Sequence, residues 1–201
     1  MKMKKVISVY NLKGGVGKST LSILTATYLQ KKGFNIILID SDIQQNSTTE
    51  YIKFSGLNID CYSISEKLTQ ADLDGLDADF IIIDGTPRTD KYVENILNLS
   101  DIILIPIQPT QLSLSSLLQP AHLKMLKNLA QKVKIVINGT TPYNGKDVQE
   151  IKKVIEDIGL NIHGTMGIRK AYILDYSKPF FAQKNNKAHN ELGYLIDTLI
   201  Q

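Results

Sequence analysis

The stretch KVISVYNLKGGVGKST, residues 5–20, joins an apolar run to a segment rich in glycine and lysine. Residues 5–10 are mostly β-branched or aromatic, which favours a strand. From Lys18 onward apolar side chains recur at helical spacing, which predicts a helix over residues 18–32. Glycines between the two segments permit a tight turn. The stretch therefore predicts a strand that turns directly into a helix.

The same alternation continues along the chain. The predicted strands are residues 5–10, 35–40, 79–84, 101–107 and 132–138, with a weaker one near 162–168. The predicted helices are residues 18–32, 44–54, 90–98, 112–130, 145–158 and 187–200. Nearly continuous Ile and Val runs are typical of parallel strands covered on both faces. We therefore expect an α/β fold with a doubly wound, mostly parallel sheet flanked by helices, in one domain over residues 1–201.

Composition narrows the class of protein. The chain has 201 residues, a formal net charge of +3 and a single cysteine, Cys61. One cysteine allows no intramolecular disulfide, and it cannot alone provide a four-cysteine zinc or iron–sulfur site. No segment approaches the roughly 20 apolar residues of a membrane span. We expect a protein of the reducing cytoplasm that binds no membrane.

Polar and glycine-rich residues follow each predicted strand. After the first five strands come NLKGGVGKST, DSDIQQN, DGTPRTD, QPTQ and NGTTP. Because ligands of doubly wound folds bind at the carboxyl ends of the strands, these segments predict a site at one edge of the sheet.

The first of these segments nearly fits the phosphate-loop pattern G-x-x-x-x-G-K-[ST]. In that pattern backbone N–H groups surround phosphate oxygens, the lysine contacts the β- and γ-phosphates, and the hydroxyl binds Mg²⁺. Here those last two residues are Lys18 and Ser19, but Leu12 stands where the first glycine belongs, followed by Lys13. A glycine-rich surface turn with solvated lysines is the alternative.

The departure from the pattern is informative, because KGGVGKST resembles the deviant loop K-G-G-x-G-K-[ST] of the ParA/MinD superfamily of ATPases. The resemblance implies the P-loop NTPase fold, with ATP and Mg²⁺ as cofactors. It also implies that Lys13 crosses a dimer interface to the partner's nucleotide, as an arginine finger does in other NTPases. It implies catalytic roles for Lys13, Lys18 and Asp42. The implied nucleotide contacts are Lys13, Gly14, Gly15, Val16, Gly17, Lys18, Ser19, Thr20, Pro109 and Asn138.

Two aspartate segments extend the resemblance. LIDSDIQQN resembles the family motif D-x-D-P-Q, with Ile43 in place of the proline, and implies that Asp42 orients the attacking water. FIIIDGTP matches the Walker B segment ending at Asp84. The implied metal ligands are Ser19, Asp40 and Asp84. Each aspartate could instead be a helix cap or turn residue, as Asn138 could be, and Pro109 could simply end a strand.

Among the subfamilies, the chain looks most like short partition ATPases. These dimerise on ATP, bind DNA without sequence preference and respond to a ParB-like centromere-binding partner. The phosphate loop starts so early that we expect no N-terminal helix-turn-helix domain. From His163 to Asn190 there are five basic residues and one acidic residue. The implied DNA contacts are Arg169, Lys170 and Lys178, although a solvated basic face is the alternative. Nucleoid association in the cytoplasm follows.

Other readings remain open. A MinD-like protein would bind membranes through a C-terminal amphipathic helix, but the polar face of residues 187–200 carries Glu191 and Asp197 and suits an anionic membrane poorly. We expect that helix to pack on the core. Relatives that position other protein cargo would share all the motifs, and a metabolic ATP-dependent ligase of similar fold would not need Lys13.

Overall fold

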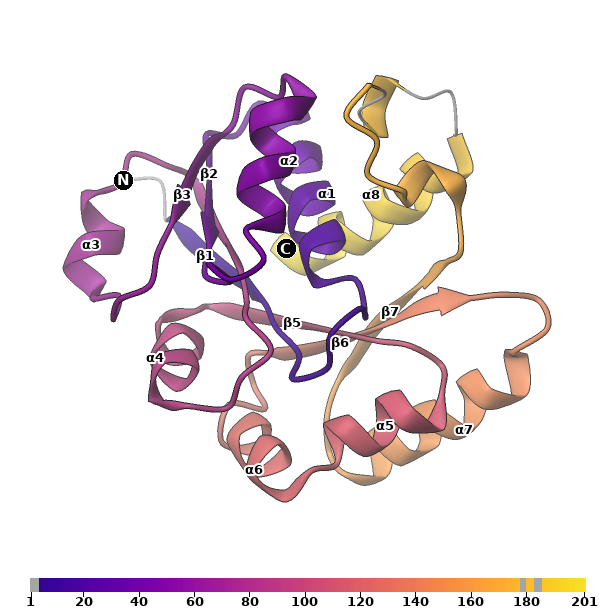
Figure 1. The fold of residues 1–201 in the computed structure, drawn as a ribbon. Coiled ribbons are helices and arrows are strands. Elements are labelled where there is room, and N and C mark those ends of the chain that lie inside the picture. Colours follow the sequence, from indigo (N-terminus) through magenta and orange to yellow (C-terminus); the bar gives the residue numbers. More distant parts are fainter. Residues whose placement is uncertain (1–3, 178–179, 183–185) are drawn as a thin grey trace.

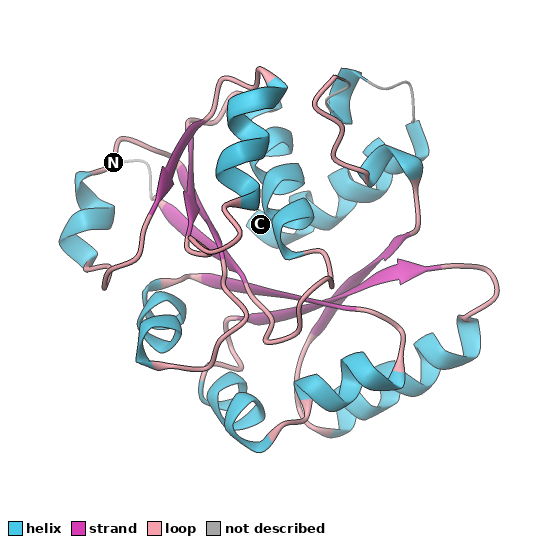
Figure 2. Ribbon diagram, viewed as in Figure 1, coloured by secondary structure: helices cyan, strands magenta, loops and turns pink. Residues whose placement is uncertain are grey.

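Seven strands form one sheet between two layers of helices in the computed structural model, which describes residues 4–177, 180–182 and 186–201 (Figure 1). The strand order is β3-β2-β4-β1-β5-β6-β7, and every neighbouring pair is parallel. The predicted fold class is therefore confirmed, with a sheet that is parallel throughout. Figure 2 shows the strands crossing the centre and the helices above and below them.

The strands are β1 (Lys5–Val9), β2 (Ile36–Asp40), β3 (Asp60–Ser63), β4 (Phe80–Asp84), β5 (Ile102–Ile107), β6 (Val133–Thr140) and β7 (Ile162–Gly167). The helices are α1 (Lys18–Lys31), α2 (Ser47–Ser55), α3 (Gln70–Gly75), α4 (Lys91–Leu99), α5 (Gln111–Leu117), α6 (Pro120–Asn128), α7 (Gly145–Asp157) and α8 (Asn186–Ile200), with short 3-10 turns η1 (Lys170–Tyr172) and η2 (Phe180–Ala182).

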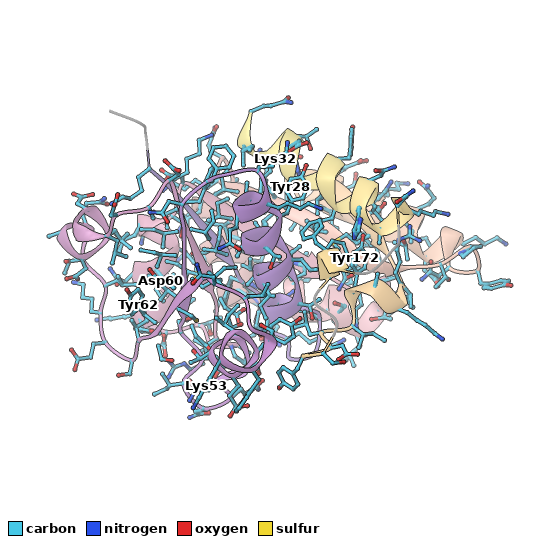
Figure 3. The ribbon with its side chains drawn as sticks, turned by 90° about the horizontal axis from the view of Figure 1, so that it is seen from above. Tyr28, Lys32, Lys53, Asp60, Tyr62 and Tyr172 are labelled. Atoms are coloured by element: carbon cyan, nitrogen blue, oxygen red, sulfur yellow. The ribbon has the colours of Figure 1, made fainter. Side chains whose placement is uncertain are left out.

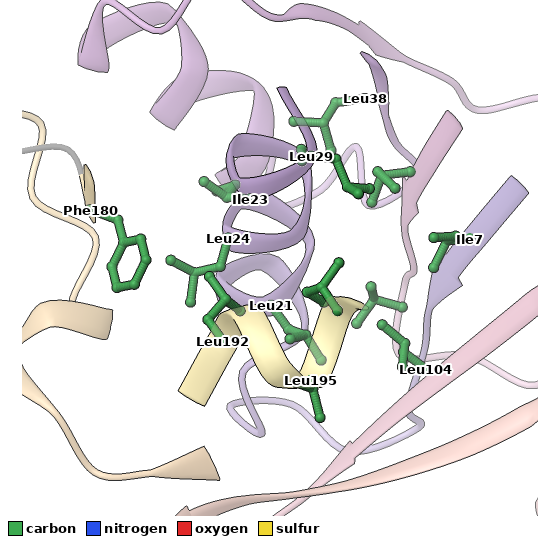
Figure 4. Packing of buried hydrophobic residues seen from close by; sticks show 14 of the residues in the cluster. Ile7, Leu21, Ile23, Leu24, Leu29, Leu38, Leu104, Phe180, Leu192 and Leu195 are labelled. Atoms are coloured by element: carbon green, nitrogen blue, oxygen red, sulfur yellow. The ribbon is translucent and has the colours of Figure 1, made fainter. Parts of the chain in front are cut away.

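Successive side chains of each central strand point alternately into the two helix layers that cover the sheet. Ile7 of β1 and Ile82 of β4 pack with α1, α2 and α8, whereas Val6 and Ile81 face the opposite side with α3 and α4. Figure 4 shows the first layer, where leucines of α1 meet Leu192 and Leu195 of α8. Because the central strands β1, β2, β4 and β5 are covered on both faces, their residues are mostly apolar without alternation, as the sequence predicted.

The structure differs from the sequence prediction in two places. Residues 112–130 were predicted as one helix, which is wrong: α5 ends at Leu117 and α6 begins at Pro120. Proline has no N–H to donate and its ring fits only the first turn of a helix, so it starts α6 rather than continuing α5. Strand β3 and helix α3 were not predicted, because both are short and largely exposed.

Helix α8 packs on the core, as predicted. Leu192, Leu195 and Ile196 are almost fully buried in the cluster shared with α1. Near the end of α8, Asp197 accepts hydrogen bonds from Tyr28 of α1 (2.8 Å) and from Lys32, the residue after α1 (2.6 Å); Figure 3 labels both donors. Of the helices in the described parts of the chain, none has the length and apolar character to traverse a bilayer.

The segment that follows η1 returns to α2. The rings of Tyr51 on α2 and Tyr176 stack with centroids 5.5 Å apart, and Phe54 meets Tyr176 edge-on. Such aromatic pairs stabilise a contact by about 0.5–1.5 kcal/mol beyond the area that they bury. The chain beyond β7 is thus fastened to α2 as well as to α8.

Candidate nucleotide-binding site

The loop between β1 and α1 has the conformation that its glycines permit. Gly15 has φ of +73° and Gly17 has φ of +99°, values that side chains other than glycine's adopt at a cost. A Cβ atom on Gly17 would lie 2.5 Å from the amide nitrogen of Asn138. The loop therefore passes close to β6 before α1 begins at Lys18.

Asn11 anchors the start of this loop. It is fully buried, and its amide nitrogen donates to the carbonyl of Pro106 on β5 (2.8 Å). Its amide oxygen accepts the backbone N–H of Lys13 (2.9 Å). One side chain therefore ties the phosphate loop to the neighbouring strand and orients the peptide of Lys13.

Lys18 lies beneath the loop. Its ammonium is largely buried and donates to the carbonyl of Lys13 (3.2 Å). Burial lowers the pKa of Lys18, and the carboxylates of Asp84 and Asp42 act in the opposite direction. The cation and the two carboxylates thus share one site, as the sequence predicted they would.

Asp84 occupies the centre of the site. Strand register pairs it with Val9 of β1 on one side and with Asp40 of β2 on the other. One carboxylate oxygen accepts the hydroxyl of Ser22 (3.0 Å) and the other accepts the hydroxyl of Thr48 (2.6 Å). Burial raises the pKa of Asp84 to about 6, although hydrogen bonds from Thr48, Ser19 and Ser22 act to lower it.

Asp40 and Asp42 organise the loop after β2. Asp40 is fully buried, and one of its oxygens accepts the N–H of Asp42 (3.0 Å). Its other oxygen accepts the N–H and the hydroxyl of Thr49, at 3.1 and 3.2 Å. Asp42 is partly exposed, and its carbonyl receives the N–H groups of Gln45 and Asn46. Asp42 is therefore the carboxylate that solvent reaches.

A cavity of about 450 Å³ opens beside the loop. Pro109 and Asn138, both predicted from the sequence, contribute to its wall together with Gly17 and Thr20. The Asn138 amide also donates to the carbonyl of Val16 (2.9 Å), so it braces the phosphate loop. The cavity is large enough for a nucleoside and lies next to the predicted phosphate site.

The predicted DNA contacts have different surroundings. Arg169 lines the cavity and pairs with Glu191 of α8, with its Nε atom 3.1 Å from the carboxylate. Lys170 is exposed to solvent. Lys178 lies outside the described residues. The guanidinium of Arg169 thus has an intramolecular partner.

Glu191 gathers four donors. Besides two nitrogens of Arg169, it accepts the N–H of Gly167 (3.0 Å) and the hydroxyl of Tyr172 (2.8 Å). Burial alone would raise the pKa of Glu191, but the bonds from Arg169 and Tyr172 outweigh it and lower that pKa. Since Gly167, Arg169 and Tyr172 all line the cavity, Glu191 holds its outer wall.

The residues present fit a magnesium nucleotide. The glycine loop and Lys18 suit phosphate oxygens, and Ser19 with Asp84 and Asp40 forms an oxygen-only donor set of the kind that Mg²⁺ prefers. Within the described residues no cluster of three or more His, Cys, Asp or Glu could hold a metal ion. Magnesium commonly uses one or two carboxylates and completes its shell with phosphate oxygens and water.

Sequence reasoning missed the residues that hold the site. Asn11, Ser22, Thr48, Thr49 and Glu191 were given no role, yet each bonds a residue that was predicted. Asn11 follows the first strand directly, and Thr48 and Thr49 open the helix after DSDIQQN. A polar residue directly after the first strand and polar residues at the start of this helix were the signals from which Asn11, Thr48 and Thr49 could have been predicted.

Comparison with known proteins agrees with this geometry. A family model described as "AAA domain" matches residues 4–77 and 53–138. The sporulation initiation inhibitor protein Soj of Bacillus subtilis (strain 168) is 25% identical over 206 residues, a match that covers 77% of this chain and 81% of Soj.

Solved structures share the fold. A plasmid partition protein from Borrelia burgdorferi B31 bound to AMPPNP matches with a TM-score of 0.74 and 21% identity over 99% of both chains. A chain of the MinC:MinD cell division protein complex from Aquifex aeolicus matches with a TM-score of 0.76 and 16% identity, over 98% of this chain and 96% of that one. The family model spans the loop, both aspartate segments and Asn138. The chain therefore belongs to the AAA-domain family and is a member of the ParA/MinD superfamily of P-loop ATPases.

Proposed function

We propose that this protein is an ATP-dependent, dimerising partition ATPase that binds DNA without sequence preference. It hydrolyses ATP with Mg²⁺ and segregates plasmid or chromosomal DNA together with a ParB-like centromere-binding partner, at the nucleoid in the cytoplasm. The observation that carries this proposal is a second lysine, Lys13, in the same loop as Lys18, with its carbonyl accepting the Lys18 ammonium. A monomeric ATPase would have no use for the second lysine.

The side chain of Lys13 supports a role outside its own subunit. Its peptide is fixed by Asn11, and its carbonyl is taken by Lys18. Its ammonium forms no ion pair with any residue in the described part of the chain. A cation held at its backbone but unpaired at its tip suits the charge that develops on a transferred phosphoryl group in the opposite subunit.

Lys18, Asp42 and Asp84 would act within one subunit. Lys18 would bind the phosphate oxygens, while Asp84 and Ser19, with Asp40 behind them, would hold Mg²⁺, which would neutralise phosphate charge. Asp42 is the carboxylate open to solvent, so it is the group suited to orient a water molecule. Slow turnover is expected until a partner completes the arrangement.

Apolar side chains around the cavity support pairing of two subunits. Ile168 and Ile173 line the cavity and are nevertheless 71% and 65% exposed. Leu112, two residues after Thr110 of the cavity wall, is 70% exposed, and Tyr143, next to Asn144, is 97% exposed. Exposed apolar residues that gather at the rim of a charged site are typical of an interaction surface.

DNA binding would rest on the basic segment after β7. Lys170 is exposed there, and paired subunits would double such contacts and raise avidity. Contacts of lysine with phosphates make binding weaken steeply as salt rises. Arg169 would take part only after leaving Glu191, so Lys170 is the better candidate in this conformation.

The test is binding to unrelated DNA fragments with ATP, with ADP and without nucleotide, at two salt concentrations. We expect tight binding only with ATP, and a marked loss at the higher salt concentration. Equal binding in all three nucleotide states would overturn the partition proposal and leave the nucleotide site intact. The same samples in size-exclusion chromatography report whether ATP alone produces dimers.

A MinD-like role at membranes is the second candidate, since a MinC:MinD chain shares the fold. The apolar face of α8, which such a role would insert into lipid, is instead buried against α1. Sedimentation with anionic vesicles in the presence of ATP separates the two. Binding to vesicles without binding to DNA would favour membrane or protein cargo.

A further inference from the structure

We propose that Thr48, the second residue of α2, is the positioning residue for the Asp84 carboxylate, and that its hydroxyl sets the Mg²⁺ affinity of the nucleotide site. The proposal rests on the proposed binding of a magnesium nucleotide. It adds Thr48 and helix α2 to that site. The experiment below can refute the inference while the proposed function still stands.

The first observation is the contact itself. Thr48 is fully buried, and its hydroxyl donates to one Asp84 oxygen at 2.6 Å. A charge-assisted bond of that length is among the stronger hydrogen bonds in proteins. It fixes which carboxylate oxygen faces α2 and which faces α1.

Ser22 is a second donor to Asp84, but its hydroxyl is shared between two acceptors. Its single hydroxyl proton has two acceptors within reach, the carbonyl of Lys18 and the second Asp84 oxygen, both at 3.0 Å. A serine inside a helix commonly bonds the carbonyl four residues back. Thr48, by contrast, has Asp84 as its one recorded acceptor among the described residues, so Thr48 is the donor that holds the carboxylate.

The backbone explains why α2 can reach both carboxylates. Asp40 and Asp84 pair in register on neighbouring strands, which lie about 4.8 Å apart. Consecutive Cα atoms are about 3.8 Å apart, so two successive residues of a helix that begins over the strand ends can each address one strand. Thr48 bonds Asp84, and Thr49 bonds Asp40.

The turn that precedes α2 places the start of the helix over the two strand ends. Asn46, which precedes the helix, has φ of +48°, and it is the one non-glycine residue with positive φ in the described part of the chain. Asparagine tolerates this conformation better than most residues but still at some cost. The strained turn brings the chain from Asp42 back over the sheet, so that the helix starts with its hydroxyls above the carboxylates.

A residue can change metal affinity without touching the metal, by hydrogen-bonding one of the metal's ligands. Residues that hydrogen-bond a ligating carboxylate fix its orientation, and their loss commonly weakens metal binding 10–100-fold. Without the Thr48 hydroxyl, the Asp84 carboxylate keeps, among the described residues, only Ser19 and the divided bond of Ser22 as partners. The carboxylate can then rotate away from the direction in which a metal needs it.

The experiment measures how much Mg²⁺ is needed for binding of a fluorescent ADP analogue, so that hydrolysis plays no part. Thr48→Val replaces the hydroxyl with a methyl group of similar size, and Thr48→Ser keeps the hydroxyl. We expect Thr48→Val to raise the half-saturating Mg²⁺ concentration at least about ten-fold. Binding of the analogue in EDTA should stay unchanged, and Thr48→Ser should restore the wild-type value.

Thr27→Val is the matched control. Thr27 is another buried threonine, and its hydroxyl donates to the carbonyl of Ile23 within α1 (2.7 Å), its one acceptor in the described part of the chain. That variant reports what the loss of a buried hydroxyl does to folding without touching Asp84. Urea unfolding of all variants verifies that each is folded, and Thr48→Ala replaces Thr48→Val if the latter is not.

The outcomes are distinct. A folded Thr48→Val protein with the wild-type Mg²⁺ requirement overturns the inference while leaving the nucleotide site in place. An equal rise in Thr27→Val would also overturn it, because the effect would then be general destabilisation. If the wild-type protein binds the analogue identically with and without Mg²⁺, the proposed function fails together with the inference.

Discussion

Arg169 is held by Glu191 across the space between the end of β7 and helix α8, with the Arg169 Nε atom 3.1 Å from the carboxylate. We expect Glu191→Gln to lower the free energy of unfolding by about 2 kcal/mol, because a partly buried guanidinium loses its charged partner. ADP should also bind more weakly, since Gly167 and Tyr172 of the cavity wall lose the same anchor. Urea unfolding and ADP titration measure the two effects.

Asp197→Asn is the control on the same helix. Asp197 pairs with Lys32 at the surface, where both side chains are well exposed, so its loss should change stability by about 0.5 kcal/mol or less. It lies away from the cavity and should leave ADP affinity unchanged. Equal effects of the two substitutions would mean that Glu191 holds no special position.

The two loop lysines should separate nucleotide binding from pairing. Lys18 is buried within its own site, so Lys18→Ala should abolish detectable ATP binding. Lys13→Ala should leave ATP binding to the single subunit nearly intact but remove the ATP-dependent dimer and most hydrolysis. ATP titration together with light scattering distinguishes the two, and a Lys13→Ala protein that still dimerises and hydrolyses normally contradicts the proposed role.

Asp84 should make the metal-free protein less stable as pH rises. Its folded-state pKa is about 6 against an ordinary value of 3.8, so the folded chain binds more protons than the unfolded chain between those values. Stability contributed by the neutral form is full below pH 4 and falls by about 3 kcal/mol as pH rises through 6. Urea unfolding in EDTA from pH 4 to 7 measures this, and Asp84→Asn should flatten the profile.

Gly14 and Gly17, two glycines of the same loop, should respond differently to alanine. Gly17→Ala places a Cβ against the Asn138 amide at a backbone conformation with φ of +99°, so we expect a loss of about 1–2 kcal/mol and weaker ADP binding. A Cβ on Gly14 would meet no atom within 4 Å, and its φ is not positive. Gly14→Ala should change the free energy of unfolding by about 0.5 kcal/mol or less. A similar loss in both variants would show that the loop is not constrained in this way.

The sequence predicted the sheet, and the edge of the sheet at which the proposed site residues lie, because both follow from local patterns. Runs such as FIIID encode a buried strand, and the carboxyl ends of parallel strands share an edge, so the sequence alone could place Asp40, Asp84 and Lys18 near one another. Strand β3 escaped prediction because DCYS is exposed and short, and its pairing with β2 depends on the register of the whole sheet.

The contacts that hold the site are long-range, and no local pattern encodes them. Asn11 meets Pro106 across 95 residues, and Thr48 meets Asp84 across 36. Glu191, which pairs with Arg169, lies one residue beyond the basic segment that ends at Asn190. Glu191 and Arg169 come close only because α8 folds back over β7.

The stacked rings of Tyr51 and Tyr176 connect α2 with the segment that leads away from the cavity. The first turn of α2 bonds the carboxylates and its second turn carries Tyr51. The irregular segment that leads to Tyr176 begins at the cavity. The exposed Phe54 ring, which meets Tyr176, thus contacts a segment that begins at the cavity and lies on the helix whose first turn bonds Asp84.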